Sequence, residues 1–164
     1  MTSRPAKQTY LSIDQIRKRM ADYCVYRDRS EREVRRKLAE FRLRPEVEDD
    51  IVAFLIQHQF LDDLRFARSY ARGKFYHNRW GKRKIVEGLR RHGLTDYYIR
   101  QALDEIPAED YAATLRRLIA RKRQSLSGVS PAKRRTKIIA YLQSKGYDYA
   151  EFKNILDEIC QTPE

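Results

Sequence analysis

Residues 85–106 read IVEGLRRHGLTDYYIRQALDEI, and residues 138–159 read IIAYLQSKGYDYAEFKNILDEI. Large apolar residues occupy the same places in both stretches, always 53 positions apart, as from 85 to 138. The matched residues are Ile85, Leu89, Leu94, Ile99, Leu103 and Ile106 in the first stretch, and Ile138, Leu142, Tyr147, Phe152, Leu156 and Ile159 in the second. The same pattern occurs 51 or 52 positions earlier, at Val34, Leu38, Leu43, Val47, Ile51 and Phe54. Three copies of one unit therefore fill the chain.

Each copy has the apolar spacing of two helices. Residues three and four positions apart share one face of a helix, and a short turn interrupts the pattern once in each copy, which predicts an αα-hairpin. A further helix is expected before each hairpin, around residues 13–24, 66–70 and 111–119. No alternating pattern of useful length predicts a strand.

Residues typical of helix ends support this interpretation. Ser30 with Glu33 has the spacing of a capping box, and Ser130 stands before a proline, as at a helix start. Gly93 and Gly146 stand where helices should end.

The predicted fold class is all-α, with three tandem three-helix repeats that form an elongated or curved array. We expect repeat 1 over residues 10–60, repeat 2 over 61–107 and repeat 3 over 108–160, with a flexible N-terminus over 1–9 and a C-terminal tail over 161–164. A unit of about 50 residues buries little surface alone, so the repeats should pack on their neighbours.

The positive charge is unevenly distributed. The chain has 35 Lys and Arg against 23 Asp and Glu, a net charge of +12. Residues 65–100 hold eleven basic and two acidic side chains, and residues 116–137 hold nine basic and none acidic. Residues 45–64, 101–115 and 138–164 are net acidic. The predicted third helices are therefore acidic, whereas the first and second are basic.

Such basic surfaces attract phosphate through counterion release, which predicts sequence-independent, salt-dependent binding to single- and double-stranded DNA. A charge cluster is also often only a solvated face. The residues expected to contact DNA or a DNA-coated partner are Arg72, Lys74, Arg79, Lys82, Arg83, Lys84, Arg90, Arg91, Arg117, Arg121, Lys122, Arg123, Lys133, Arg134, Arg135 and Lys137. We expect Arg83, Arg90 and Arg91 to project away from the core of their helix.

No pattern in the chain predicts catalysis, a cofactor or a metal site. The GxxxxGK, GxSxG and HExxH motifs are missing, and the three histidines share no metal spacing with each other or with Cys24 and Cys160. Asp62 and Asp63 suit a helix N-terminus better than a catalytic pair. Trp80 is expected to pack against its hairpin rather than stack on a base, and both cysteines are expected to pack as small hydrophobes.

We expect a cytoplasmic protein that does not enter a membrane. No apolar run approaches the ~20 residues that cross a bilayer, and the first residues lack the apolar stretch of a signal peptide.

Three stretches carry a family resemblance. They are SEREVRRKL at residues 30–38, FLDDLRFA at 60–67 followed by Tyr70, and WGKRKI at 80–85 followed by Leu89 and by HGL at 92–94. Together they resemble the RecX family of recombinase regulators, over about residues 12–160. The third repeat departs from the pattern, because its second helix starts about a turn earlier and lacks the Trp-Gly pair.

The resemblance implies tandem three-helix repeats that bind the RecA–DNA filament. It implies that they modulate, and usually inhibit, RecA recombinase and ATPase activity in DNA recombination, repair and the SOS response. It supplies no catalytic residue. Binding along the filament groove and binding at a filament end both stay open.

Two other classes of function remain. A general DNA-binding protein without a recombinase partner would have the same charge distribution, and would bind naked and RecA-coated DNA equally well. A small nuclease or other enzyme is disfavoured by the missing metal-ligand pattern.

Overall fold

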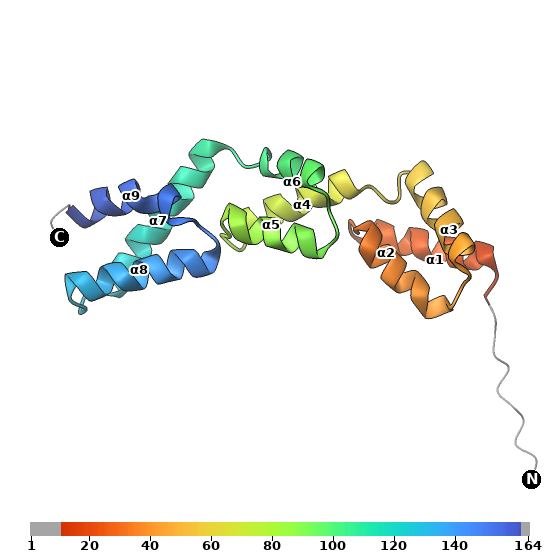
Figure 1. Ribbon diagram of the computed structural model, residues 1–164, viewed down its shortest axis with the longest axis horizontal. Helices are drawn as coiled ribbons and strands as arrows, with labels where there is room; N and C mark the ends of the chain where they lie inside the picture. Colours follow the sequence, from red (N-terminus) through yellow and green to blue (C-terminus); the bar gives the residue numbers. More distant parts are fainter. Residues whose placement is uncertain (1–10, 162–164) are drawn as a thin grey trace, which may run out of the picture. The chain divides into compact units, whose positions relative to one another are not determined.

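The chain forms an all-helical fold. The computed structural model describes residues 11–161, and within that range it contains nine α-helices, one 3-10 helix and no strand (Figure 1). The predicted all-α class with three-helix repeats is confirmed. The predictions for residues 1–9 and 162–164 lie outside the described residues. The chain divides into two compact units, Met1–Asp62 and Asp63–Glu164.

The first unit holds one three-helix group. Its elements are α1 (Ile13–Tyr26), α2 (Glu31–Leu38), the 3-10 helix η1 (Ala39–Phe41) and α3 (Pro45–Gln57). Their apolar faces meet in a core of their own, formed by Ile16, Met20, Cys24, Val34, Leu38, Ile51, Val52, Leu55 and Leu61.

The start of α2 carries the predicted capping box. The Glu33 amide donates to Ser30 Oγ over 3.2 Å, and the Ser30 amide donates to Glu33 Oε2 over 3.0 Å. Only 7% of the Glu33 side chain is exposed, and Arg27 donates to its carboxylate over 2.8 Å. Because a buried charge without a partner is costly, this guanidinium stabilises the buried cap.

The second unit begins with α4 (Asp63–Tyr76), α5 (Lys82–Arg91) and α6 (Asp96–Leu103). Asp62 directly precedes α4, at the helix start that the sequence predicts for it. Glu105, just after α6, forms ion pairs with Arg68 and Arg72 of α4. These ion pairs link the end of the third helix of this group to the first helix.

The second unit continues with α7 (Ala108–Ser125), α8 (Pro131–Lys145) and α9 (Tyr149–Gln161). The acidic α9 is bonded to both of its neighbours, since Arg116 of α7 lies 2.8 Å from a Glu158 carboxylate oxygen and α8 makes a similar pair. Helix α9 includes Gln161, the first residue of the predicted tail.

All six helices of the second unit share one hydrophobic core. It runs without a break from α4 to α9 and holds every matched apolar position of the two repeats, with Leu103 and Ile159 half-buried at its edge. Its largest fully buried side chains are Phe75, Ile85, Leu89, Leu115, Ile119, Ile138, Tyr147 and Phe152. Repeats 2 and 3 are therefore a single packed body.

The two cysteines differ from each other. Cys24 is buried in the core of the first unit, as predicted. Cys160 is exposed, so the prediction that it packs as a small hydrophobe is wrong. It lies in the last turn of α9, beyond the last core contact at Ile159.

Two glycines let the backbones of repeats 2 and 3 touch. The Gly81 amide, just before α5, donates to the Lys145 carbonyl over 2.8 Å, and the Arg83 amide donates to the Gly146 carbonyl over 3.2 Å. Gly146 ends α8 with a positive φ of 93°. A Cβ on Gly81 would collide with Gly146, and a Cβ on Gly146 would collide with Lys84. We call the contact of residues 78–84 with Tyr111 and residues 143–151 the repeat joint.

Two buried tyrosines complete the repeat joint. The Tyr147 hydroxyl donates to the Arg79 carbonyl over 3.1 Å. The Tyr111 hydroxyl accepts from the Lys82 amide over 3.1 Å and donates to a Glu151 carboxylate oxygen over 3.1 Å. Burial raises the pKa of both phenols far above the ordinary value, so both stay protonated and can donate.

The shared core makes Leu89 a test of the fold. Leu89 is fully buried. Leu89→Ala should lower the free energy of unfolding by about 2 to 5 kcal/mol, because it removes transfer free energy and leaves a cavity. Glu87→Ala, at an exposed position of the same helix, should change it by less than about 0.5 kcal/mol. Denaturant unfolding followed by circular dichroism measures both, and equal effects would contradict the core assignment.

The repeat joint makes a second prediction. Gly146→Ala should destabilise the second unit by more than about 2 kcal/mol, because alanine is strained at positive φ and its Cβ meets the Lys84 backbone. Gly128→Ala is the matched control, since nothing lies within 4 Å of a Cβ there and φ is not positive. Thermal unfolding of the two variants compares them, and a tolerated alanine at 146 would show that the close approach is not required.

Candidate nucleic-acid interface

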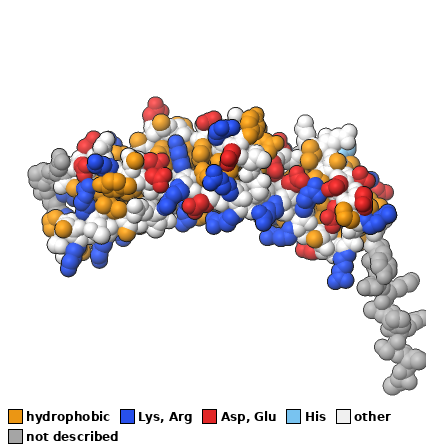
Figure 2. All heavy atoms as spheres, viewed as in Figure 1, with side chains coloured by type: hydrophobic (Ala, Val, Ile, Leu, Met, Phe, Trp, Pro, Cys, Tyr) orange, Lys and Arg blue, Asp and Glu red, His pale blue; other side chains and the backbone are white. Residues whose placement is uncertain are grey.

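The excess of positive charge lies in the second unit, because residues 63–164 hold 22 Lys and Arg against 12 Asp and Glu, whereas residues 1–62 hold 13 against 11. In the face shown in Figure 2, Lys and Arg gather over α5 and along α8. All sixteen cations predicted to contact DNA belong to this unit, and they fall into three groups by what they touch.

The first group serves the repeat joint. Arg83 Nη2 donates to the Gln143 carbonyl over 2.6 Å, and Lys84 Nζ donates to the Ser144 carbonyl over 3.2 Å. These carbonyls belong to the last turn of α8, where unpaired acceptors and the helix dipole favour cations. Lys82 Nζ lies 4.9 Å from the centre of the Tyr111 ring. Arg83 projects away from the core, as predicted, with 48% of its side chain exposed, and its guanidinium also caps the last turn of α8 in the neighbouring repeat.

Trp80 lies between two of the predicted cations. Lys74 Nζ and Lys84 Nζ are 4.8 Å and 4.6 Å from the centre of its ring, within the range of a cation–π interaction. The indole is half-buried and packs against the shared core. Its predicted role in packing is confirmed.

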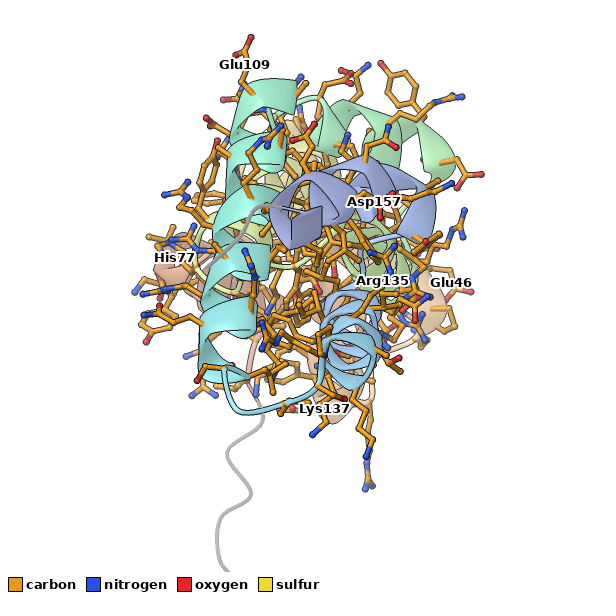
Figure 3. The ribbon with its side chains drawn as sticks, turned by 90° about the vertical axis from the view of Figure 1, so that its left-hand side faces the viewer. Glu46, His77, Glu109, Arg135, Lys137 and Asp157 are labelled. Carbon is orange, nitrogen blue, oxygen red and sulfur yellow. The ribbon has the colours of Figure 1, made fainter. Side chains whose placement is uncertain are left out.

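The cations of the second group interact with other residues of the second unit, mostly through ion pairs and hydrogen bonds. Arg72 lies 2.7 Å from Glu105 and Arg90 lies 3.4 Å from Asp96. Arg135 of α8 lies 2.7 Å from Asp157 of α9, and Figure 3 shows the two side chains together. Three further members contact carbonyls or a ring: Arg123 the Ile159 carbonyl, Arg134 the Ser127 and Val129 carbonyls, and Lys122 the Tyr141 ring. The charge of Arg91 acts on the Tyr70 phenol, whose pKa burial raises and this charge lowers.

The third group has no ion pair to any acid in the described part of the chain. Its members are Arg79, Arg117, Arg121, Lys133 and Lys137, and all five are exposed. Lys137 points outward from α8 in Figure 3. These cations keep their full charge for an external anion, so they are the strongest candidates for phosphate contacts.

Three members of this group meet at one hollow of about 460 Å³. Arg79 comes from the loop between α4 and α5, and Arg117 and Arg121 come from one face of α7. The wall is completed by Thr114, Leu118 and Ala120. We call this the arginine hollow. The sequence predicted each of the three arginines as a DNA contact but did not predict that they lie together. Arg79 is 38 positions from Arg117 in the sequence, and only the repeat joint brings them close.

Residues 11–161 offer no group of three or more His, Cys, Asp and Glu side chains that could hold a metal ion. Within the same range, no helix has the length and apolar character needed to cross a membrane.

Two family models match the second unit. Residues 62–103 match the second three-helix domain of RecX, and residues 109–156 match its third three-helix domain.

Relatives and solved structures agree with these matches. The regulatory protein RecX of Vibrio parahaemolyticus is 31% identical over 133 residues, which cover 79% of this chain and 82% of that protein. The RecX of Clostridium acetobutylicum is 30% identical over 80% of this chain, which spans only 62% of that longer relative. The crystal structure of RecX from Lactobacillus salivarius has a TM-score of 0.83 and 23% identity, and covers 90% of this chain and 96% of its own.

The fold and the family models define a class of protein built from tandem three-helix domains. The chain belongs to the RecX family.

The roles of the cations make a third prediction. Arg83→Ala should lower the free energy of unfolding by about 1 kcal/mol, because the last turn of α8 loses a donor. Arg90→Ala should change it by less than about 0.5 kcal/mol, because its ion pair with Asp96 is exposed. Urea unfolding of the two variants tests the difference. If Arg83→Ala leaves the free energy of unfolding unchanged, the hydrogen bond from Arg83 to the last turn of α8 does not stabilise the fold.

Proposed function

We propose that this chain is a regulator that binds the RecA–DNA filament and lowers the recombinase and ATPase activity of RecA in the cytoplasm. Membership of the RecX family, whose relatives are named regulatory proteins, supports the regulatory role. The five exposed cations of the third group supply the physical means. They allow the second unit to neutralise DNA phosphate without breaking its own contacts.

Electrostatics accounts for weak, sequence-independent binding. Cations that displace condensed counterions from DNA gain affinity that falls steeply with salt, and nothing in the third group is placed to distinguish bases. The acidic α9 would be repelled by the same phosphate, as would Asp104 and Glu105 just after α6, so these parts face protein or solvent in the complex. Binding through the basic helices then leaves a defined orientation on the filament.

Inhibition follows from occupancy. A protein seated on filament DNA blocks pairing with a second DNA molecule or perturbs the contacts between RecA subunits, and one bound at an end stops growth. Each route lowers strand exchange and ATP hydrolysis without chemistry by this chain.

The fourth prediction tests this function with charge-matched variants. Arg117→Ala with Arg121→Ala removes two cations of the third group, whereas Arg100→Ala with Lys153→Ala removes two exposed cations from the third helices of the two repeats, α6 and α9. Only the first pair should weaken binding to RecA-coated single-stranded DNA. It should also reduce the slope of log affinity against log salt by about 1 for each phosphate that the protein no longer neutralises.

RecA-dependent ATP hydrolysis and strand exchange are measured with each protein titrated in. The wild type and the Arg100, Lys153 control should inhibit, and the α7 pair should inhibit less at equal concentration. Unchanged RecA rates with equimolar wild type would contradict the regulator. Equal affinity for naked and RecA-coated DNA would instead indicate a general DNA-binding protein.

A further inference from the structure

The arginine hollow is more specific than a diffuse basic surface. We propose that it binds one phosphate group of the DNA backbone through the guanidinium groups of Arg79, Arg117 and Arg121. This inference rests on the proposed function, because it names the place where nucleic acid is held. It goes further because it requires the paired donors of arginine side chains, and because it requires repeats 2 and 3 to pack together so that Arg79 lies beside Arg117 and Arg121.

The charge of the hollow is unbalanced. Three guanidinium groups line it, and none of its other lining residues, Thr114, Leu118 and Ala120, is acidic. The only bond from these guanidinium groups within the described residues is from Arg117 Nε to the Ala113 carbonyl, over 3.3 Å in its own helix. Like charges that share a cavity repel each other, and a bound anion removes that repulsion. The hollow is therefore suited to an anion.

The side-chain type selects phosphate. A guanidinium presents planar, paired donors that match two oxygens of one phosphate, whereas a lysine ammonium acts as a point charge. All three cations at the hollow are arginines, although the unit is also rich in lysine. Thr114 adds a hydroxyl to the wall.

The repeat joint sets the position of Arg79. Its backbone has a positive φ of 58°, its amide donates to the Phe75 carbonyl over 3.0 Å, and its carbonyl accepts from Tyr147 over 3.1 Å. Tyr147 is fully buried and belongs to repeat 3. Repeat 3 thus holds the backbone of the arginine that repeat 2 contributes, so the site is assembled before the ligand arrives. Such preorganisation lowers the entropy cost of binding.

The hollow has room for more than a phosphate. Its volume of about 460 Å³ also accepts the sugars on either side, and Leu118 and Ala120 offer an apolar wall for them. A second hollow of about 290 Å³ shares Ala120 and is lined by Arg123, Gln124 and Ser127. The backbone of a strand can therefore continue along α7 from the first hollow into the second.

The fifth prediction separates a site from a surface. Arg79→Lys and Arg121→Lys keep the net charge but lose the paired donors. Each should weaken binding of a single-stranded oligonucleotide by about tenfold, whereas a diffuse surface tolerates lysine. Arg100→Lys, at an exposed position of α6 outside the hollow, is the matched control and should leave the affinity unchanged. Circular dichroism melting confirms that each variant is folded.

The source of the phosphate is tested on the wild-type chain. NMR of arginine Nε–H groups should show that inorganic phosphate perturbs Arg79, Arg117 and Arg121, and that an oligonucleotide does so at far lower concentration. A methylphosphonate oligonucleotide, which lacks the backbone charge, should not. If only inorganic phosphate acts, the assignment to DNA is wrong and the site takes a free anion.

The failures of the two proposals differ. Lysine variants that bind DNA as tightly as the wild type would overturn the phosphate site, while wild-type inhibition of RecA would still support the regulator. A wild type that leaves RecA unaffected would overturn the regulator. In that case, perturbation of the three arginines by the oligonucleotide would still support the site.

Discussion

The close approach of Gly81 and Gly146 is the constraint on which the second unit depends. Without side chains at these two positions, the start of α5 and the end of α8 bond through their backbones. That contact keeps the two halves of the core together, brings Arg83 and Lys84 to the last turn of α8, and lets Tyr147 reach the Arg79 carbonyl. The arginine hollow exists because these contacts coincide.

The excess positive charge has two uses in this unit. Some cations donate hydrogen bonds to the unpaired carbonyls at the end of a helix, as Arg83 does at α8. Others form ion pairs with acids of the third helix, as Arg135 does with Asp157. Their charge contributes to the fold and is partly neutralised. Others, such as Arg121 and Lys137, keep their charge for an external partner. The net charge of +12 therefore overstates the positive charge that is available to DNA. Only the second set of cations should determine how DNA affinity depends on salt.

Local patterns predicted the fold well, and long-range contacts explain what they missed. The 53-residue repeat located the core, and the capping box at Ser30 and the turn at Gly146 followed from neighbouring residues. The cap made by Arg83 and the convergence at the hollow join residues far apart in the sequence, so no periodicity reveals them. The prediction for Cys160 failed because α9 continues beyond Ile159, the last residue of this helix that packs on the core. The repeat boundaries and the DNA contacts stay predictions.

Native-state hydrogen exchange tests most directly whether repeats 2 and 3 are one body. If the repeat joint couples them, the slowest amides of α5 and α8 should exchange with the same free energy of opening and the same dependence on denaturant, because both open only when the whole unit unfolds. If α8 instead opens at a clearly lower free energy while α5 stays protected, the two repeats unfold independently. The joint would then not be the constraint that assembles the arginine hollow.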